Sequence, residues 1–364
     1  MLISGEPVES ECPWSWAPSC YYNSHVFHAS LGTYTDVEKI DKIFLHLDHG
    51  IVSLPVKFVS RKKKKGLTVC VEPVYWYSQF QNIILFIEAW RAHGADNFII
   101  YFHSSTKEVR LVLDYYQRLG IISIRPWPKF PDLHPKFPDV NAQTYRIAHT
   151  LAINICLLEM ESELGTFVDF DEVIVPPSGD LRMFVEKELS IPSVGALQFT
   201  HSLMNVKLSS DKILFDKGSI MNPVFLKKEG PPKLVFNTSA VDIILTHGIR
   251  RFVPNSNNKT IEAKGALLHN RYDSLSRNLT IRSSQLKIFP SKVEKHIRNM
   301  EKVVAELKKN SELSFDRMII LELNKCIDQM RESGECRSAV IKCREQMEKL
   351  ANWYFDETPD VFLH

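Results

Sequence analysis

Between residues 67 and 175 the apolar positions change their spacing several times, and this pattern predicts strands that alternate with helices. Short apolar runs typical of buried strands cover residues 67–71, 97–102, 121–126 and 167–175. Apolar residues recur every three or four positions in the stretches between them, which predicts helices over 79–93, between Ser104 and Gly120, and over 141–160. Such alternation indicates an α/β, Rossmann-like fold, with a mainly parallel sheet and helices on both faces.

Two flanking regions differ from this alternating part. Short alternating segments within residues 1–66 predict a small β-rich lead-in. From Pro290 the chain becomes charged, with one narrow apolar stripe at helical spacing, which predicts a helical C-terminal tail packed on the core. Further strands are predicted at 196–201, 233–236, 241–248 and 265–272. We therefore expect three parts, 1–66, 67–289 and 290–364.

The last strand of the alternating part carries two carboxylates one residue apart, Asp169 and Asp171. On a strand these side chains point to the same side, and two convergent hard oxygen ligands suit Mn²⁺ or Mg²⁺ bound to a diphosphate. A bare Asp-x-Asp is more often a polar turn at the end of a strand. In a parallel sheet, however, ligands bind beyond the carboxyl ends of the strands, which is where this pair is expected. We therefore interpret it as a nucleotide-sugar site.

Composition excludes several other classes of protein. The 364 residues carry a net charge of +2, so no nucleic-acid partner is expected. No apolar run reaches the roughly 18 residues of a membrane-spanning helix, and the first residues do not resemble a signal peptide, so we expect no membrane anchor in this chain.

The seven cysteines contain no C-x-x-C pair, which argues against a zinc site. Cys70 and Cys156 lie in apolar segments and are expected to be buried thiols. The placements of the other five would suit disulfides in an oxidising lumen: Cys12, Cys20, Cys326, Cys336 and Cys343. The odd total leaves at least one free thiol or an intermolecular bond. Three Asn-x-Ser/Thr sequences, at Asn237, Asn258 and Asn278, are consistent with a secretory route.

Several blocks of residues 20–275 together resemble glycosyltransferase family 92. The matching blocks are 70–77, 86–95, 98–101, 112–116, 120–122, 125–128, 168–172 and Pro176. The resemblance implies a GT-A fold, a divalent metal, usually Mn²⁺, and a UDP-sugar donor, in known members UDP-galactose. It implies transfer of galactose with inversion onto a glycan or glycoprotein acceptor, such as the fucose of an N-glycan core. Family members are typically Golgi membrane proteins.

The resemblance also suggests roles for individual residues. Asp169 and Asp171 would hold the metal, with His269 as the first choice for a third ligand and His247 as the second. Inversion needs a general base, and the spacing leaves three candidates open: Glu172, Asp180 and Glu186. Glu172 is closest to the metal pair, although the next position on a strand would point the other way. Residues expected to contact the nucleotide or its diphosphate are Glu72, Pro73, Tyr75, Tyr77, Arg146 and Arg271.

Each of these residues also has a plain structural interpretation. A lone histidine after an apolar strand is more often structural than a ligand, and Arg146 and Arg271 are more often ion-pair partners. Two alternatives to the galactosyltransferase stay open. One is the same fold with another donor or acceptor sugar, and the other is a catalytically inactive glycan-binding or scaffold protein.

Overall fold

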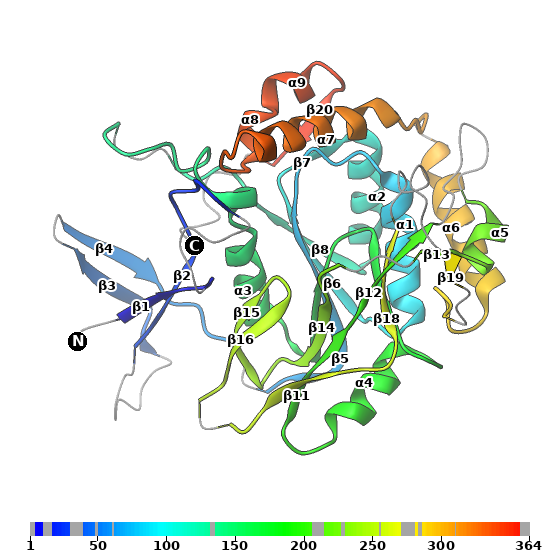
Figure 1. The fold of residues 1–364 in the computed structure, drawn as a ribbon, viewed down its shortest axis with the longest axis horizontal. Coiled ribbons are helices and arrows are strands. Elements are labelled where there is room, and N and C mark those ends of the chain that lie inside the picture. Colours follow the sequence, from blue (N-terminus) through cyan, green and yellow to red (C-terminus); the bar gives the residue numbers. More distant parts are fainter. Residues whose placement is uncertain are drawn as a thin grey trace.

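The structure is a computed structural model, and it describes residues 4–9, 17–29, 39–47, 50–59, 62–131, 135–205, 215–226, 230–254, 256–270, 281–282, 286–309 and 311–356. Its centre is a seven-stranded sheet in the order β17-β11-β14-β9-β5-β6-β8 (Figure 1). In chain order these strands are β5 (Lys64–Val74), β6 (Asn97–Phe102), β8 (Ile122–Pro126), β9 (Ser162–Val168), β11 (Val194–Phe199), β14 (Lys233–Asn237) and β17 (Lys259–Glu262).

The central sheet is mainly parallel. Strands β9, β5, β6 and β8 are parallel neighbours, and β11 pairs in parallel with β17. Only β14 runs against both of its neighbours, β9 and β11. The predicted α/β, Rossmann-like fold, with strands and helices in alternation, is therefore confirmed.

Helices cover both faces of this sheet because successive strand residues point to opposite sides. Phe98, Ile100 and Phe102 of β6 pack into one core with α1 (Phe80–Ala92) and α2 (Lys107–Arg118). The intervening Ile99 and Tyr101 pack into a second core with α3 (His149–Glu159). Each layer of helices thus packs against the apolar residues of one face of the strands, as buried parallel strands require.

One predicted helix has the wrong start, and one short strand was not predicted. The third helix begins at His149 rather than at residue 141, because a 3₁₀ turn, η2 (Tyr145–Ala148), precedes it with Arg146, Ile147 and Ala148 all in the left-handed region. Residues Ser104–Thr106 form a short strand, β7, that pairs with β20 (Trp353–Phe355). Thr106 still precedes α2, but its side chain does not cap the helix.

The acidic segment is also not one continuous strand. β9 ends at Val168, and the chain then turns, with the amide of Glu172 donating to the carbonyl of Asp169 at 3.0 Å. It continues as β10 (Glu172–Val175) in a second, five-stranded sheet of order β10-β18-β12-β13-β19. The other members are β12 (His201–Asn205), β13 (Val224–Leu226), β18 (Ala266–Asn270) and β19 (Ile281–Arg282). The two aspartates therefore lie in the turn that joins the two sheets.

The ends of the chain lie outside the two sheets. The predicted β-rich lead-in forms two pairs at the left of Figure 1, β1 (Ser4–Pro7) with β2 (His25–His28) and β3 (Lys42–Leu47) with β4 (Gly50–Pro55). The predicted helical tail consists of α6 (Val293–Lys308), α7 (Arg317–Glu332), α8 (Ala339–Lys342) and α9 (Arg344–Glu348). The three-part division of the chain itself stays a prediction.

The apolar stripe of α6 joins the core that also contains α1, as the spacing predicted. Helices α7 to α9 lie along the top of Figure 1 and pack around Trp76, which follows β5. The remaining elements are α4 (Leu181–Leu189), α5 (Lys217–Met221) and the hairpin of β15 (Val241–Leu245) and β16 (Gly248–Phe252). In the described ranges, no helix has the length and apolarity that crossing a membrane requires.

Three disulfides connect distant parts of the fold. Cys20 bonds to Cys336, 316 residues away, and so ties the lead-in to the C-terminal tail. Cys326 bonds to Cys343 within that tail. Cys70 bonds to Cys156 and links β5 to α3, so the expectation of two free buried thiols is wrong. Cys12 lies outside the described residues.

Loss of the Cys20–Cys336 bond should cost more stability than loss of Cys326–Cys343. The first closes a loop of 316 residues and the second a loop of 17, and the chain-entropy cost of an open loop grows with its length. We expect Cys20→Ser/Cys336→Ser to lower the free energy of unfolding by about 4–5 kcal/mol, and Cys326→Ser/Cys343→Ser by about 3 kcal/mol. Urea unfolding under non-reducing conditions measures both, and the reverse order would contradict the loop-length argument.

Candidate active site

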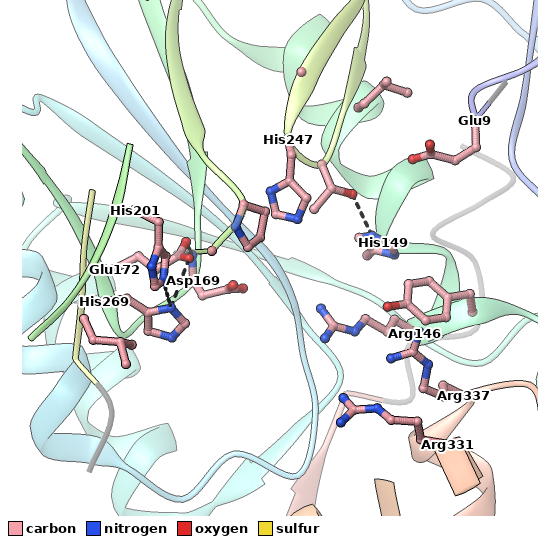
Figure 2. Close-up of a pocket in the computed structure, with 17 residues that line it drawn as sticks. Glu9, Arg146, His149, Asp169, Glu172, His201, His247, His269, Arg331 and Arg337 are labelled. Carbon is pink, nitrogen blue, oxygen red and sulfur yellow. Dashed lines mark hydrogen bonds and ion pairs between the residues drawn. The ribbon is translucent and has the colours of Figure 1, made fainter. Parts of the chain in front are cut away.

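The acidic turn after β9 lies between two cavities. The larger, of about 510 Å³, is lined on one side by Asp169, Glu172, His201 and His269, and on the other by three arginines together with His149 and Glu9 (Figure 2). The smaller, of about 250 Å³, lies against the end of β5. Arg146, His149, Asp169 and His269 line both cavities. The two cavities therefore form one site, with the turn and these shared side chains at its middle.

A buried lysine holds the turn in place. Lys233 opens β14, and its side chain is only 2% exposed. Its Nζ lies 3.4 Å from Glu172 Oε2, 3.6 Å from Glu72 Oε1 and 3.8 Å from Asp169 Oδ2. Glu72 belongs to β5, so this ammonium group joins β5, β14 and both ends of the acidic turn. We call Lys233, Glu72, Asp169 and Glu172 the lysine cluster.

The carboxyl groups of the lysine cluster differ in how readily they ionise. Burial opposes the charged form of Lys233, but Glu172, Asp169 and Glu72 outweigh it and raise the pKa of its ammonium group. Burial raises the pKa of Glu172 to about 7, against the opposing effect of Lys233. Burial and then Asp169 also raise the pKa of Glu72. For Asp169, burial is outweighed by Lys233 and Arg146, which lower its pKa. Asp169 is thus held ionised.

Asp171 lies at the end of a short chain of polar contacts. His269 Nε2 is 3.1 Å from Asp171 Oδ2, and His269 Nδ1 is 3.0 Å from His201 Nε2. The neighbouring strands β18 and β12 carry these two histidines, and β18 pairs with β10 directly after the turn. One imidazole nitrogen of His269 thus faces a carboxylate while the other is oriented by a second side chain. Histidine ligands of metal ions are commonly supported in this way.

Asp171 and His269 therefore offer one oxygen and one nitrogen donor to a cation. Asp169 adds a carboxylate whose side chain is 42% exposed. Across the described ranges, no three His, Cys, Asp or Glu side chains are arranged as a complete metal site. The donors fit Mg²⁺ or Mn²⁺ in the manner of phosphate-dependent sites, where one or two carboxylates bind the ion and substrate phosphates and water complete its coordination.

The structure brings most of the predicted residues to this site. Glu72, Pro73, Tyr75 and Tyr77 line the smaller cavity, and Arg146 lies between the two cavities. Arg271 lies outside the described residues.

His247 lines the larger cavity, and its Nδ1 is 3.0 Å from the carbonyl of Pro232. Burial and then Lys233 lower the pKa of His247 to about 4, so its imidazole is neutral at pH 7. A neutral imidazole can act as a ligand, but His247 contacts the backbone of Pro232.

Two of the three predicted base candidates lie elsewhere. Asp180 caps α4, with its carboxylate accepting from the amide of Met183 at 2.9 Å. Glu186, on the same helix, pairs with Arg182 at 3.0 Å. Neither residue lines either cavity of the site. We therefore retain neither as a base.

Glu172 does lie in the site, contrary to the alternation argument that pointed it away. The chain turns at residues 169–172, so strand alternation does not apply there. Glu172 Oε2 instead accepts from the amide of Asp169 at 3.0 Å, and the side chain lines the larger cavity.

Sequence reasoning missed Lys233, His201, Arg331 and Arg337. A weak signal existed for Lys233, because it directly precedes the apolar run Leu234–Phe236 of a predicted strand, and a lysine buried with that strand would need a charged partner. The arginines belong to the helical tail, far from the acidic turn in the sequence, and only the fold brings them to the cavity.

A family model described as Glycosyltransferase family 92 matches residues 65–318. Two family 92 glycosyltransferase proteins of Caenorhabditis elegans are similar, one 26% identical over 118 residues and one 25% identical over 182 residues. These matches cover 31% and 47% of this chain but only 23% and 36% of the two relatives. The chain therefore matches about a quarter to a third of their length.

Solved structures resemble the fold only distantly. Residues 1–349 of TarS from S. aureus match 68% of this chain and 67% of that one, with 10% identity and a TM-score of 0.31. Glucosyl-3-phosphoglycerate synthase from Mycobacterium tuberculosis, in complex with Mn²⁺, UDP and glucosyl-3-phosphoglycerate, matches 69% of this chain and 83% of that one. Its identity is 10% and its TM-score 0.30, so neither likeness supports an argument about the site.

Replacing the buried lysine should destabilise the fold strongly. Lys233→Met removes the positive charge that Glu72, Asp169 and Glu172 share, and leaving a buried carboxylate without its partner costs about 3–5 kcal/mol. We expect a loss of that size in the free energy of unfolding at pH 7, measured by urea unfolding. Lys295→Met, on the exposed face of α6, is the matched control and should change stability by less than about 0.5 kcal/mol. Equal stability of the two variants would refute the role of Lys233.

Glu9, which also lines the larger cavity, should make stability depend on pH. It is 7% exposed, and burial raises its pKa from 4.5 to about 7, against the opposing effect of Arg250. Between these values the folded protein binds more protons than the unfolded chain, so the free energy of unfolding falls as the pH rises from 4.5 to 7. Glu9→Gln should remove this contribution to the decrease in the free energy of unfolding. Urea unfolding at pH 4.5 and 7.5 tests this, and parallel pH profiles of variant and wild type would contradict it.

Proposed function

Because this chain belongs to glycosyltransferase family 92, we propose that it transfers a sugar from a nucleotide-sugar donor to a glycan acceptor. The observation that carries the proposal is the position of the acidic turn. Asp169 and Asp171 lie at the carboxyl end of β9, between two cavities that share Arg146 and His269. An α/β sheet binds its ligands at this edge, and two substrates can meet there on either side of one charged centre.

The smaller cavity is proposed to take the nucleotide. It lies at the end of β5 and is lined by Tyr75 and Tyr77, with Leu323 and Ile327 of α7 on its other wall. An aromatic and aliphatic surface of this kind suits a planar base. Arg146 lies where this cavity meets the larger one, so its guanidinium group is placed to bind the diphosphate with paired hydrogen bonds.

Asp171 and His269 are the residues proposed to hold Mn²⁺ or Mg²⁺, with Asp169 completing the protein ligands directly or through water. When bound, such an ion neutralises charge on the leaving diphosphate. Lys233 keeps Asp169 ionised, and His201 orients His269 through its Nδ1. His247 remains an alternative third ligand that stands beside the larger cavity.

The larger cavity is proposed to take the acceptor. Glu172 lines it and is the base candidate that the fold brings to the site, where it would accept the proton of the attacking hydroxyl. The resemblance to family 92 further supports UDP-galactose as the donor, transfer with inversion, a glycan or glycoprotein acceptor such as core fucose, and a Golgi location with membrane association. These finer features belong to the proposal.

Replacing Asp171 should abolish turnover while leaving the fold intact. Purified protein is incubated with UDP-galactose and fucosylated N-glycan acceptors, with and without Mn²⁺, and UDP release and product are measured. We expect metal-dependent turnover that falls at least roughly a hundred-fold in Asp171→Asn, because the ion loses a carboxylate ligand. Asp114→Asn on α2 is the matched control, since Asp114 pairs with Arg110 away from both cavities.

Other outcomes separate the alternatives. UDP and Mn²⁺ binding without turnover would indicate a different donor sugar or acceptor. Glycan binding without either UDP or Mn²⁺ binding would favour the inactive glycan-binding protein. Full turnover by Asp171→Asn would refute the proposed metal site.

A further inference from the structure

The wall of the larger cavity that faces the carboxylates is built from arginines. Arg146 comes from η2, Arg331 from the last turn of α7 and Arg337 from the segment before α8, and Figure 2 shows all three on the same side. Arg331 and Arg337 line the larger cavity only, whereas Arg146 also lines the smaller one. Two of the three guanidinium groups therefore lie on the acceptor side and not where the nucleotide is proposed to bind.

This arginine wall is held by several independent contacts. The guanidinium groups of Arg146 and Arg337 both lie over the ring of Tyr145, at 5.5 and 5.2 Å from its centre. The amide of Arg146 donates to the carbonyl of Arg337 at 3.1 Å, and Cys336, next to Arg337, is bonded to Cys20.

The backbone that carries Arg146 is strained. Arg146, Ile147 and Ala148 have φ values of 44°, 51° and 58°, in the left-handed region that residues with a side chain seldom adopt. Trp127 Nε1 donates to the carbonyl of Ile147 at 2.8 Å and helps to maintain this conformation. Strained backbone that several contacts maintain is typical of functional sites.

The wall also concentrates like charge around one space. Guanidinium groups stay protonated at every physiological pH, so this wall presents positive charge to the cavity. Arg331 also pairs with Asp328, with 3.3 Å between Nη1 and Oδ1, but this pair is exposed to solvent and therefore weak. Glu9 is a carboxyl group on the same side of the cavity, and burial raises its pKa to about 7, so it is only partly ionised at neutral pH. Its buried Oε1 has no hydrogen-bond partner among the described residues, and a protonated Glu9 could donate to an anionic ligand.

We propose that the larger cavity recognises an acceptor glycan carrying an anionic group, a carboxylate, sulfate or phosphate ester, bound by Arg331 and Arg337. This inference rests on the proposed function for naming the ligand an acceptor. The planar guanidinium fork matches the paired oxygens of all three groups, and two such forks on one wall select for negative charge over a neutral sugar of the same shape.

The test measures binding rather than turnover. Wild-type protein is titrated with four oligosaccharides of one backbone, ending in neutral galactose, a uronic acid, a sulfated galactose or a phosphorylated galactose. We expect at least one acidic ligand to bind roughly ten- to a hundred-fold more tightly than the neutral one, and to lose that advantage at high salt. The acidic ligand that binds most tightly identifies the chemical class. Equal binding of the neutral and acidic ligands would overturn the proposal.

Substitutions then test whether the arginine wall causes the preference for acidic ligands. Arg331→Gln/Arg337→Gln should abolish the preference, and Arg331→Gln alone should reduce it. Arg331 is the safer variant for folding, since its side chain is 64% exposed. Arg298→Gln, on the exposed face of α6, is the matched control and should keep the preference. An unchanged preference in the double variant would refute the assignment.

UDP binding, measured in parallel, separates this inference from the proposed function. We expect the double variant to bind UDP as wild type does. Loss of UDP binding in that variant would instead assign these arginines to the diphosphate and overturn the inference. A preference for acidic glycans in a wild-type protein that binds no UDP would preserve the anion site and refute the transferase.

Discussion

The candidate site depends on one buried ammonium group. Lys233 contacts three carboxyl groups that come from the end of β5 and from both sides of the acidic turn. Without a cation these groups could lie together only in protonated form, because ionised carboxylates are costly to desolvate and repel one another. With it, the chain can leave the central sheet at Val168, turn within a few residues and enter the second sheet at Glu172. The position of Asp169 between the two cavities follows from this crossing.

The candidate site also depends on residues that lie outside the α/β core and line the two cavities. Helix α7 contributes Leu323 and Ile327 to the smaller cavity and Arg331 to the larger one. The tail that supplies these residues is fixed to the rest of the molecule by the packing around Trp76 and by the bond from Cys336 to Cys20. The two cavities thus depend on parts of the chain that lie before and after the alternating strands and helices. A core without the tail would keep the acidic turn and lose Leu323, Ile327, Arg331 and Arg337 from the lining of the cavities.

Several features could be predicted because they depend on local patterns. Apolar spacing identified β5, β6, β8 and the helices between them, and the fold class followed from their alternation. The Asp-x-Asp pattern also predicted Asp169 and Asp171 as site residues, because a parallel sheet binds its ligands beyond the carboxyl ends of its strands. The errors arose where a tight turn or a long-range contact overrode the local rule. Strand alternation placed Glu172 away from the aspartates, but the turn that follows Val168 brings its carboxyl group onto the amide of Asp169. Helical spacing extended α3 back to residue 141, but contacts with Arg337 and Trp127 hold residues 145–148 in a left-handed turn.

The sequence by itself determined the α/β fold, the order of its central strands along the chain, and the pair of carboxylates at the end of β9. Each of these depends on residues close together in the chain, whose spacing is set by the periods of strands and helices. The tertiary structure alone decided that Lys233 neutralises the turn, that His201 supports His269, and that Arg331 and Arg337 face them across the cavity. These partners lie tens to hundreds of residues apart in the sequence. No periodicity relates them, and they meet because the two sheets and the tail pack against one another.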